Sequence, residues 1–137
     1  MRNNAAAWRL YPSMKRSVLC SFLLATLAGA AIWSLSPLLT GHVEPWDAGG
    51  LYHPVTLALG GGLCGSVSPK PLWPLYAGCV AGQVLYLLGW LPTGPLLPVG
   101  LVFVLLCSLV FLAGAYVGSR ARTRWQARKQ QPPRGGA

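Results

Sequence analysis

Long apolar runs alternate with short polar stretches along most of the chain. Four such runs cover residues 18–39, 51–67, 72–91 and 96–118. A helix rises about 1.5 Å per residue, so a run of about 20 residues spans the roughly 30 Å hydrocarbon core of a bilayer. The pattern therefore predicts an all-α integral membrane bundle of four transmembrane helices, forming one membrane domain over residues 18–118.

The second run is short and rich in glycine, with Gly60-Gly61-Gly62 followed by Gly65. Glycine costs about 1 kcal/mol relative to alanine in an exposed helix, whereas in a membrane it lets neighbouring backbones approach closely. This segment is therefore predicted to form either a tightly packed helix or a broken one.

The first run follows a basic leader, residues 1–17, and passes through Ala28-Gly29-Ala30. A basic start, an apolar stretch and a small-residue site are also the features of a cleaved signal peptide. The apolar run continues to Leu39, which favours an uncleaved anchor. Either outcome places the next loop on the outer side of the membrane.

Composition and charge add an orientation to this picture. The chain is 53% hydrophobic and 9% charged, against about 25% charged in soluble domains. All 11 lysines and arginines lie in the leader, at Lys70 or in the tail, residues 119–137. With four spans these segments share one side, which the positive-inside rule makes cytoplasmic. The N-terminus and C-terminus are thus predicted to be cytoplasmic, in a plasma membrane such as a bacterial inner membrane.

The basic tail indicates a lipid partner more than a nucleic acid. It adjoins a span on the cytoplasmic side, where each basic residue gains about 1 kcal/mol from anionic lipid. The predicted partners are therefore the lipid bilayer and anionic lipid, with no nucleic acid. Trp125 favours an interfacial helix that continues from the fourth span, and the composition of residues 130–137 predicts disorder.

One loop holds every histidine and every acidic residue of the chain. These residues are His42, Glu44, Asp47 and His53. Imidazole and carboxylate groups suit a divalent metal such as zinc, nickel, copper or iron, but their spacing matches no metal motif, so no cofactor is predicted and a metal site is the alternative. In the favoured interpretation Asp47 caps the second helix and Trp46 anchors at the interface.

Small residues four apart recur in all four runs and predict close helix packing. Residues at this spacing share a helix face and make a flat patch on which another helix can lie. The packing can occur inside one bundle or between copies. The first run has Ala25 with Gly29, and the others have GxxxG at Gly61 and Gly65, Gly78 and Gly82, and Gly114 and Gly118.

Gln83 is the one strongly polar side chain deep in a predicted span. Lipid offers no hydrogen-bond partner, so the amide is expected to face the bundle interior and bond to another helix. A functional alternative makes Gln83 a contact in a conduction path that also uses a helix break at residues 60–62.

The chemical inventory argues against an enzyme. The chain has no GxSxG, HExxH, phosphate loop or CxxC, and its four cysteines are expected to be packing residues. The predicted function is a non-enzymatic multi-pass membrane protein, accessory or structural, that associates with itself or a larger membrane protein. One alternative is a transporter or channel subunit whose external loop gathers cations. Another is a metal or membrane-enzyme site in that loop.

Overall fold

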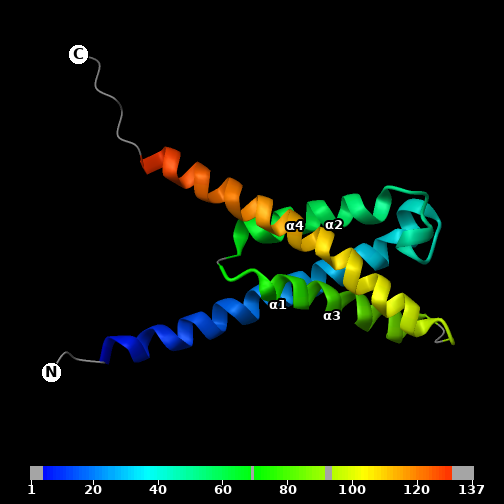
Figure 1. Ribbon diagram of the computed structural model, residues 1–137, viewed down its shortest axis with the longest axis horizontal. Coiled ribbons are helices and arrows are strands. Elements are labelled where there is room, and N and C mark those ends of the chain that lie inside the picture. Colours follow the sequence, from blue (N-terminus) through cyan, green and yellow to red (C-terminus); the bar gives the residue numbers. More distant parts are fainter. Residues whose placement is uncertain (1–4, 69, 92–93, 131–137) are drawn as a thin grey trace, which may run out of the picture.

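The chain folds into helices throughout its described part. The computed structural model describes residues 5–68, 70–91 and 94–130, with side chains from residue 15 onward. These residues form α1 (Ala5–Thr40), the short 3₁₀ turn η1 (Pro45–Asp47), α2 (Tyr52–Val67), α3 (Trp73–Trp90) and α4 (Leu97–Gln130). The all-α class is confirmed (Figure 1). The disorder predicted for the end of the tail falls mainly on residues 131–137, which lie outside the described residues.

The first and last helices extend beyond the predicted spans. α1 begins at Ala5, inside the predicted leader, and α4 continues through the basic tail to Gln130. Alanine is the strongest helix former, and three alanines open α1, while residues 119–130 contain neither glycine nor proline. The apolar runs therefore located these helices but not their ends. The continuation of the fourth helix beyond residue 118 is confirmed.

Within the described residues, two helices are long and apolar enough to cross a membrane, not the predicted four. These are α1 over Lys15–Thr40 and α4 over Leu97–Gln130. α2 has 16 residues and α3 has 18, and they extend about 24 and 27 Å, short of the roughly 30 Å core. α3 also carries the polar Gln83 and is bounded by Trp73 and Trp90, which lower its apolar character.

The four helices form two pairs of non-consecutive helices. α1 packs mainly on α3, and α2 packs mainly on α4. Figure 1 shows that the partners in each pair run in the same direction, because each pair is separated in the chain by one helix of opposite direction. The start of α1 and the end of α4 lie on one side of the bundle, together with the connection between α2 and α3. The other two connections lie on the opposite side.

Glycines set the close approach of α2 and α4. A Cβ atom added to Gly61 would overlap the carbonyl oxygen of Phe111, and one added to Gly114 would overlap that of Ala58. Gly65 and Gly118 lie equally close to the facing backbone. α2 is also continuous through residues 60–62, so the glycine run is a packed helix and not a break.

The α1–α3 pair is built in the same way. A Cβ atom on Gly78 would overlap the carbonyl oxygen of Phe22, and one on Gly82 would overlap that of Thr26. Gly29 approaches the backbone of Cys79 from the other helix. The structure thus places the small-residue faces of all four helices at contacts inside a single chain.

Apolar side chains cover the outside of the bundle as well as its inside. The interior is a small apolar core that includes Leu57, Leu75 and Phe111. Large apolar side chains are exposed on every helix, among them Leu27, Leu63, Leu88 and Leu109. All four cysteines are free, and Cys64 and Cys79 are buried in the core. An exterior of this kind suits contact with lipid or with another protein.

Candidate functional site

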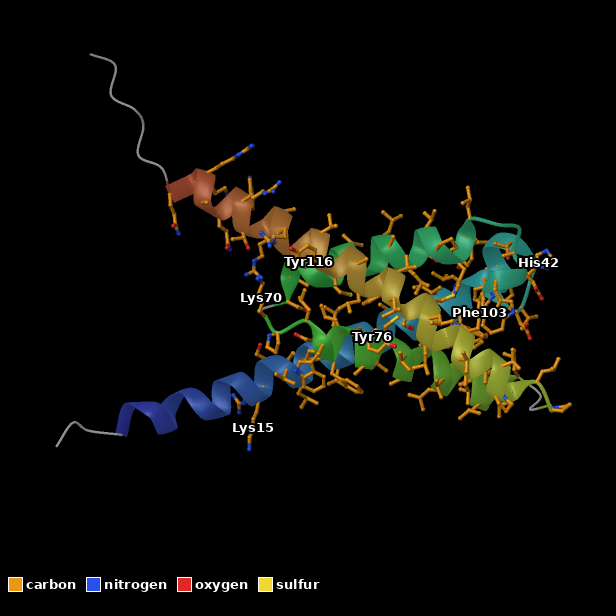
Figure 2. The ribbon with its side chains drawn as sticks, in the orientation of Figure 1. Lys15, His42, Lys70, Tyr76, Phe103 and Tyr116 are labelled. Carbon is orange, nitrogen blue, oxygen red and sulfur yellow. The ribbon has the colours of Figure 1, made fainter. Side chains whose placement is uncertain are left out.

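The loop between α1 and α2 folds back over the end of the bundle. The Ser36 hydroxyl donates a hydrogen bond to the carbonyl oxygen of His42, at 2.8 Å. Gly41, Gly49 and Gly50 have positive φ angles of 75°, 72° and 82°, which glycine adopts without steric cost. These turns bring η1 against the ends of the helices, at the end of the molecule where His42 is labelled in Figure 2.

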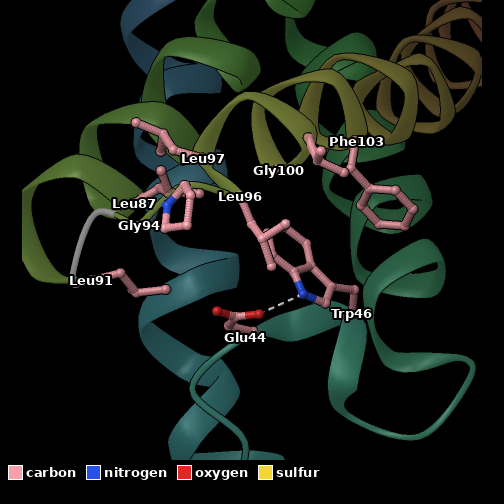
Figure 3. A pocket seen from close by; sticks show the side chains of 11 residues that line it. Glu44, Trp46, Leu87, Leu91, Gly94, Leu96, Leu97, Gly100 and Phe103 are labelled. Atoms are coloured by element: carbon pink, nitrogen blue, oxygen red, sulfur yellow. Dashed lines mark hydrogen bonds between the residues drawn. The ribbon is translucent and has the colours of Figure 1, made fainter.

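Trp46 in η1 is the centre of an aromatic cluster. Its indole N–H donates to the Glu44 carboxylate at 2.7 Å (Figure 3). The indole ring meets Trp33 of α1 edge to face, with ring centroids 4.8 Å apart, and meets Phe103 of α4 at 5.4 Å. The sequence suggested Trp46 as an interface anchor, but the ring packs onto three helices, since it also lies 6.2 Å from the His53 ring of α2.

The structure does not gather the four predicted metal ligands. His42 and Asp47 are exposed in the loop, whereas His53 is buried in the first turn of α2. Glu44 and His53 both contact Trp46. Its indole N–H donates to the Glu44 carboxylate, and its ring packs on the His53 ring. In the described part of the chain, no three His, Cys, Asp or Glu side chains are placed to hold a metal ion.

The capping role suggested for Asp47 is also wrong. Asp47 ends η1, and the N-cap of α2 is Leu51, with no side-chain hydrogen bond to the first turn. Gly49 and Gly50, which have positive φ angles, turn the loop between Asp47 and the start of α2. The Asp47 carboxylate therefore lies too far before α2 to accept from the free backbone N–H groups of its first turn.

Two cavities flank Trp46 and Phe103, which contribute to the walls of each. The larger, about 470 Å³, lies between the loop and the ends of α3 and α4 (Figure 3). Its walls are apolar except for Glu44, the one charged group that lines it. The smaller, about 240 Å³, lies between η1, α2 and α4 and is lined by His53. The end of the bundle that carries the loop therefore has room for a small molecule.

Gln83 joins three helices through its amide. The Gln83 carbonyl oxygen accepts a hydrogen bond from the Trp33 indole N–H at 3.1 Å, and its amide N–H donates to the Ser108 hydroxyl at 2.9 Å. The Ser108 hydroxyl donates in turn to the carbonyl oxygen of Val104. Gln83 is fully buried, so the amide faces the bundle interior and bonds to α1 and α4.

Sequence reasoning did not identify the aromatic cluster or the cavities around it. The available signal was the position of Trp33 within the first apolar run and of Phe103 within the fourth, but nothing in the sequence shows that these two rings meet. The chain matches no protein-family model, no curated protein and no solved structure. Its class therefore rests on the structure itself: the described residues form an all-α protein of four helices, two of which are long and apolar enough to cross a membrane.

Proposed function

We propose that this protein is a small four-span membrane protein, with its two ends in the cytoplasm, that acts without catalysis as an accessory or structural protein. α2 and α3 are short, but each lies along a helix of membrane-crossing length. The exposed apolar surfaces of α2 and α3 lie beside those of α1 and α4. If lipid is to cover all of these surfaces, all four helices must enter the bilayer. Gly29 is part of the α1–α3 contact, which supports retention of the first span.

The distribution of charge supports the proposed orientation. Lys15, Lys70 and the basic end of α4 lie toward the side where α1 begins and α4 ends, while His42 lies at the opposite side (Figure 2). Arg122 donates a hydrogen bond to the carbonyl oxygen of Val67, and Lys129 lies 3.8 Å from the ring centroid of Trp125. A cation thus lies beside an aromatic ring near the end of α4, which supports contact of this helix with anionic lipid.

The proposed role rests on one observation: the small-residue faces of the four helices pack against each other within a single chain. Because these faces are used within one bundle, a partner must contact the exposed leucine and valine side chains instead. A bundle with such an exterior, in which the buried Gln83 amide is hydrogen-bonded to its neighbours, supports association within the membrane. It does not favour the transport alternative, because α2 is unbroken and the Gln83 amide is satisfied by neighbouring side chains.

Site-specific photo-crosslinking in native membranes tests this role. A photoreactive residue at exposed Leu63 is expected to give one discrete protein adduct, whereas the same residue at buried Leu57 is expected to give none. Adducts to lipid alone from each of the exposed positions Leu27, Leu63, Leu88 and Leu109 would contradict association. Ion flux into liposomes that is lost with Gln83→Leu would favour the transport alternative, and flux equal to that of empty liposomes would exclude it.

A further inference from the structure

Glu44 is an acidic side chain with no basic neighbour in the described part of the chain. Every lysine and arginine lies in residues 2–16, at Lys70 or in residues 120–134. Figure 2 shows Lys15, Lys70 and the basic end of α4 on the side of the bundle opposite to the loop. Among the described residues, one side chain bonds to the half-buried Glu44 carboxylate, the indole of Trp46. A carboxylate accepts up to about four hydrogen bonds, so most of its capacity to bind a cation is unused.

Glu44 lies in the wall of the cavity of about 470 Å³ between the loop and the ends of α3 and α4 (Figure 3). Sites for small organic molecules usually have volumes of about 300–1,000 Å³. The other walls are leucine, valine, proline and glycine residues and the rings of Trp46 and Phe103. Leu87 is buried, whereas Leu96 and Phe103 are exposed, so the cavity has an inner wall and an open edge. The cavity thus combines one acidic group with an apolar and aromatic lining.

This combination selects the charge and the polarity of a ligand. Glu44 would repel an anion, and a neutral apolar molecule would remove water from the carboxylate without pairing it. A metal ion needs several donor groups, and Glu44 is the one His, Cys, Asp or Glu residue among the described residues of the walls. An organic cation pairs with the carboxylate, and the rings of Trp46 and Phe103 attract positive charge. Apolar substituents on the same cation would contact the leucine side chains.

We propose that this cavity binds a small organic cation, an ammonium group that carries apolar substituents, with the ammonium beside the Glu44 carboxylate. The 2.7 Å hydrogen bond from the Trp46 indole N–H holds that carboxylate in the wall. A phospholipid headgroup fits less well, because its phosphate lies between the ammonium and the acyl chains and would enter the same apolar walls. This assignment is independent of the proposed accessory role, because it rests on the cavity alone.

The test uses the full chain in micelles of an uncharged maltoside detergent, with phenyltrimethylammonium as the probe. This cation is expected to shift the Trp46 indole proton saturably in NMR spectra, because that N–H donates to the same carboxylate. tert-Butylbenzene has the same shape without the charge. It is expected to bind about tenfold more weakly, a factor between those of an exposed and a buried ion pair. Short-chain phosphatidylethanolamine, which also carries an ammonium group, is expected not to displace the probe.

Two variants with matched controls test whether the cation binds in this cavity. Glu44→Gln removes the charge but keeps an acceptor for Trp46, and it is expected to weaken binding of phenyltrimethylammonium about tenfold. Asp47→Asn changes an exposed acid of η1 outside the cavity walls and is expected to leave binding unchanged. Gly100→Leu keeps Glu44 but fills the cavity and is expected to weaken binding similarly, with Gly89→Leu at an exposed position of α3 as its control. Equal binding by wild type and Glu44→Gln, equal affinity for tert-butylbenzene, or displacement by phosphatidylethanolamine would overturn the proposal.

Discussion

Gly118→Ala tests the interlocked packing of α2 and α4 most sharply. A Cβ atom at Gly118 would overlap the carbonyl oxygen of Gly62 and crowd its carbonyl carbon and Cα. These are backbone atoms, so no side-chain rotation can relieve the overlap. The two helices must separate, and every neighbouring contact along the pair is lengthened.

The expected cost follows from that separation. A gap of about 0.5–1 Å forfeits a quarter to a half of the dispersion energy of each contact it opens. Overpacking of this kind costs about 1–3 kcal/mol in tightly packed interiors. The higher helix propensity of alanine offsets about 1 kcal/mol at most, so we expect Gly118→Ala to lower the free energy of unfolding.

Gly100→Ala is the matched control in the same helix. The nearest atom to a Cβ at Gly100 is Leu87 Cδ1 at 3.9 Å, an ordinary contact. Unfolding of each variant in mixed micelles, followed by tryptophan fluorescence, is expected to show Gly118→Ala less stable than wild type and Gly100→Ala at least as stable. Equal stability of the two variants would refute the parallel α2–α4 contact.

Three further substitutions probe the polar contacts. Gln83→Leu removes the acceptor of the Trp33 indole N–H, and we expect a loss of about 1 kcal/mol in the free energy of unfolding together with a shift of the Trp33 indole proton in NMR spectra. Glu44→Gln weakens a charge-assisted bond, so the Trp46 indole proton is expected to move upfield, with less than about 1 kcal/mol lost in a denaturant titration. Arg122→Ala frees a backbone carbonyl at the end of α2 and is expected to speed amide exchange there but not in α3.

Periodicity and composition predicted the helical architecture because they show directly which segments of the chain prefer an apolar environment to water. The apolar runs located all four helices, and the low fraction of charged residues favoured a lipid environment. The helix ends were less accessible, since α1 and α4 continue into basic segments that form helix without being apolar. The choice between a packed and a broken α2 also depended on Phe111 and Ala115 of α4, which lie about 50 residues further along the chain.

The candidate site was less predictable than the fold. Sequence proximity grouped His42, Glu44, Asp47 and His53, but the positive-φ turns and the inward-facing Trp46 separate them. The contact of the His53 ring with Trp46 depends on how the loop folds back, which no local pattern reveals. Gln83 was more predictable, because an amide in an apolar helix has few places to go other than the bundle interior.

The most direct test of the account is the membrane topology of single-cysteine variants. In a chain whose four native cysteines are replaced, His42→Cys and Lys70→Cys place one thiol in the loop between α1 and α2 or in the connection between α2 and α3. A membrane-impermeant maleimide added to intact cells is expected to label His42→Cys and to reach Lys70→Cys only after the membrane is opened. Labelling of the two variants from the same side would contradict a chain that crosses the membrane four times.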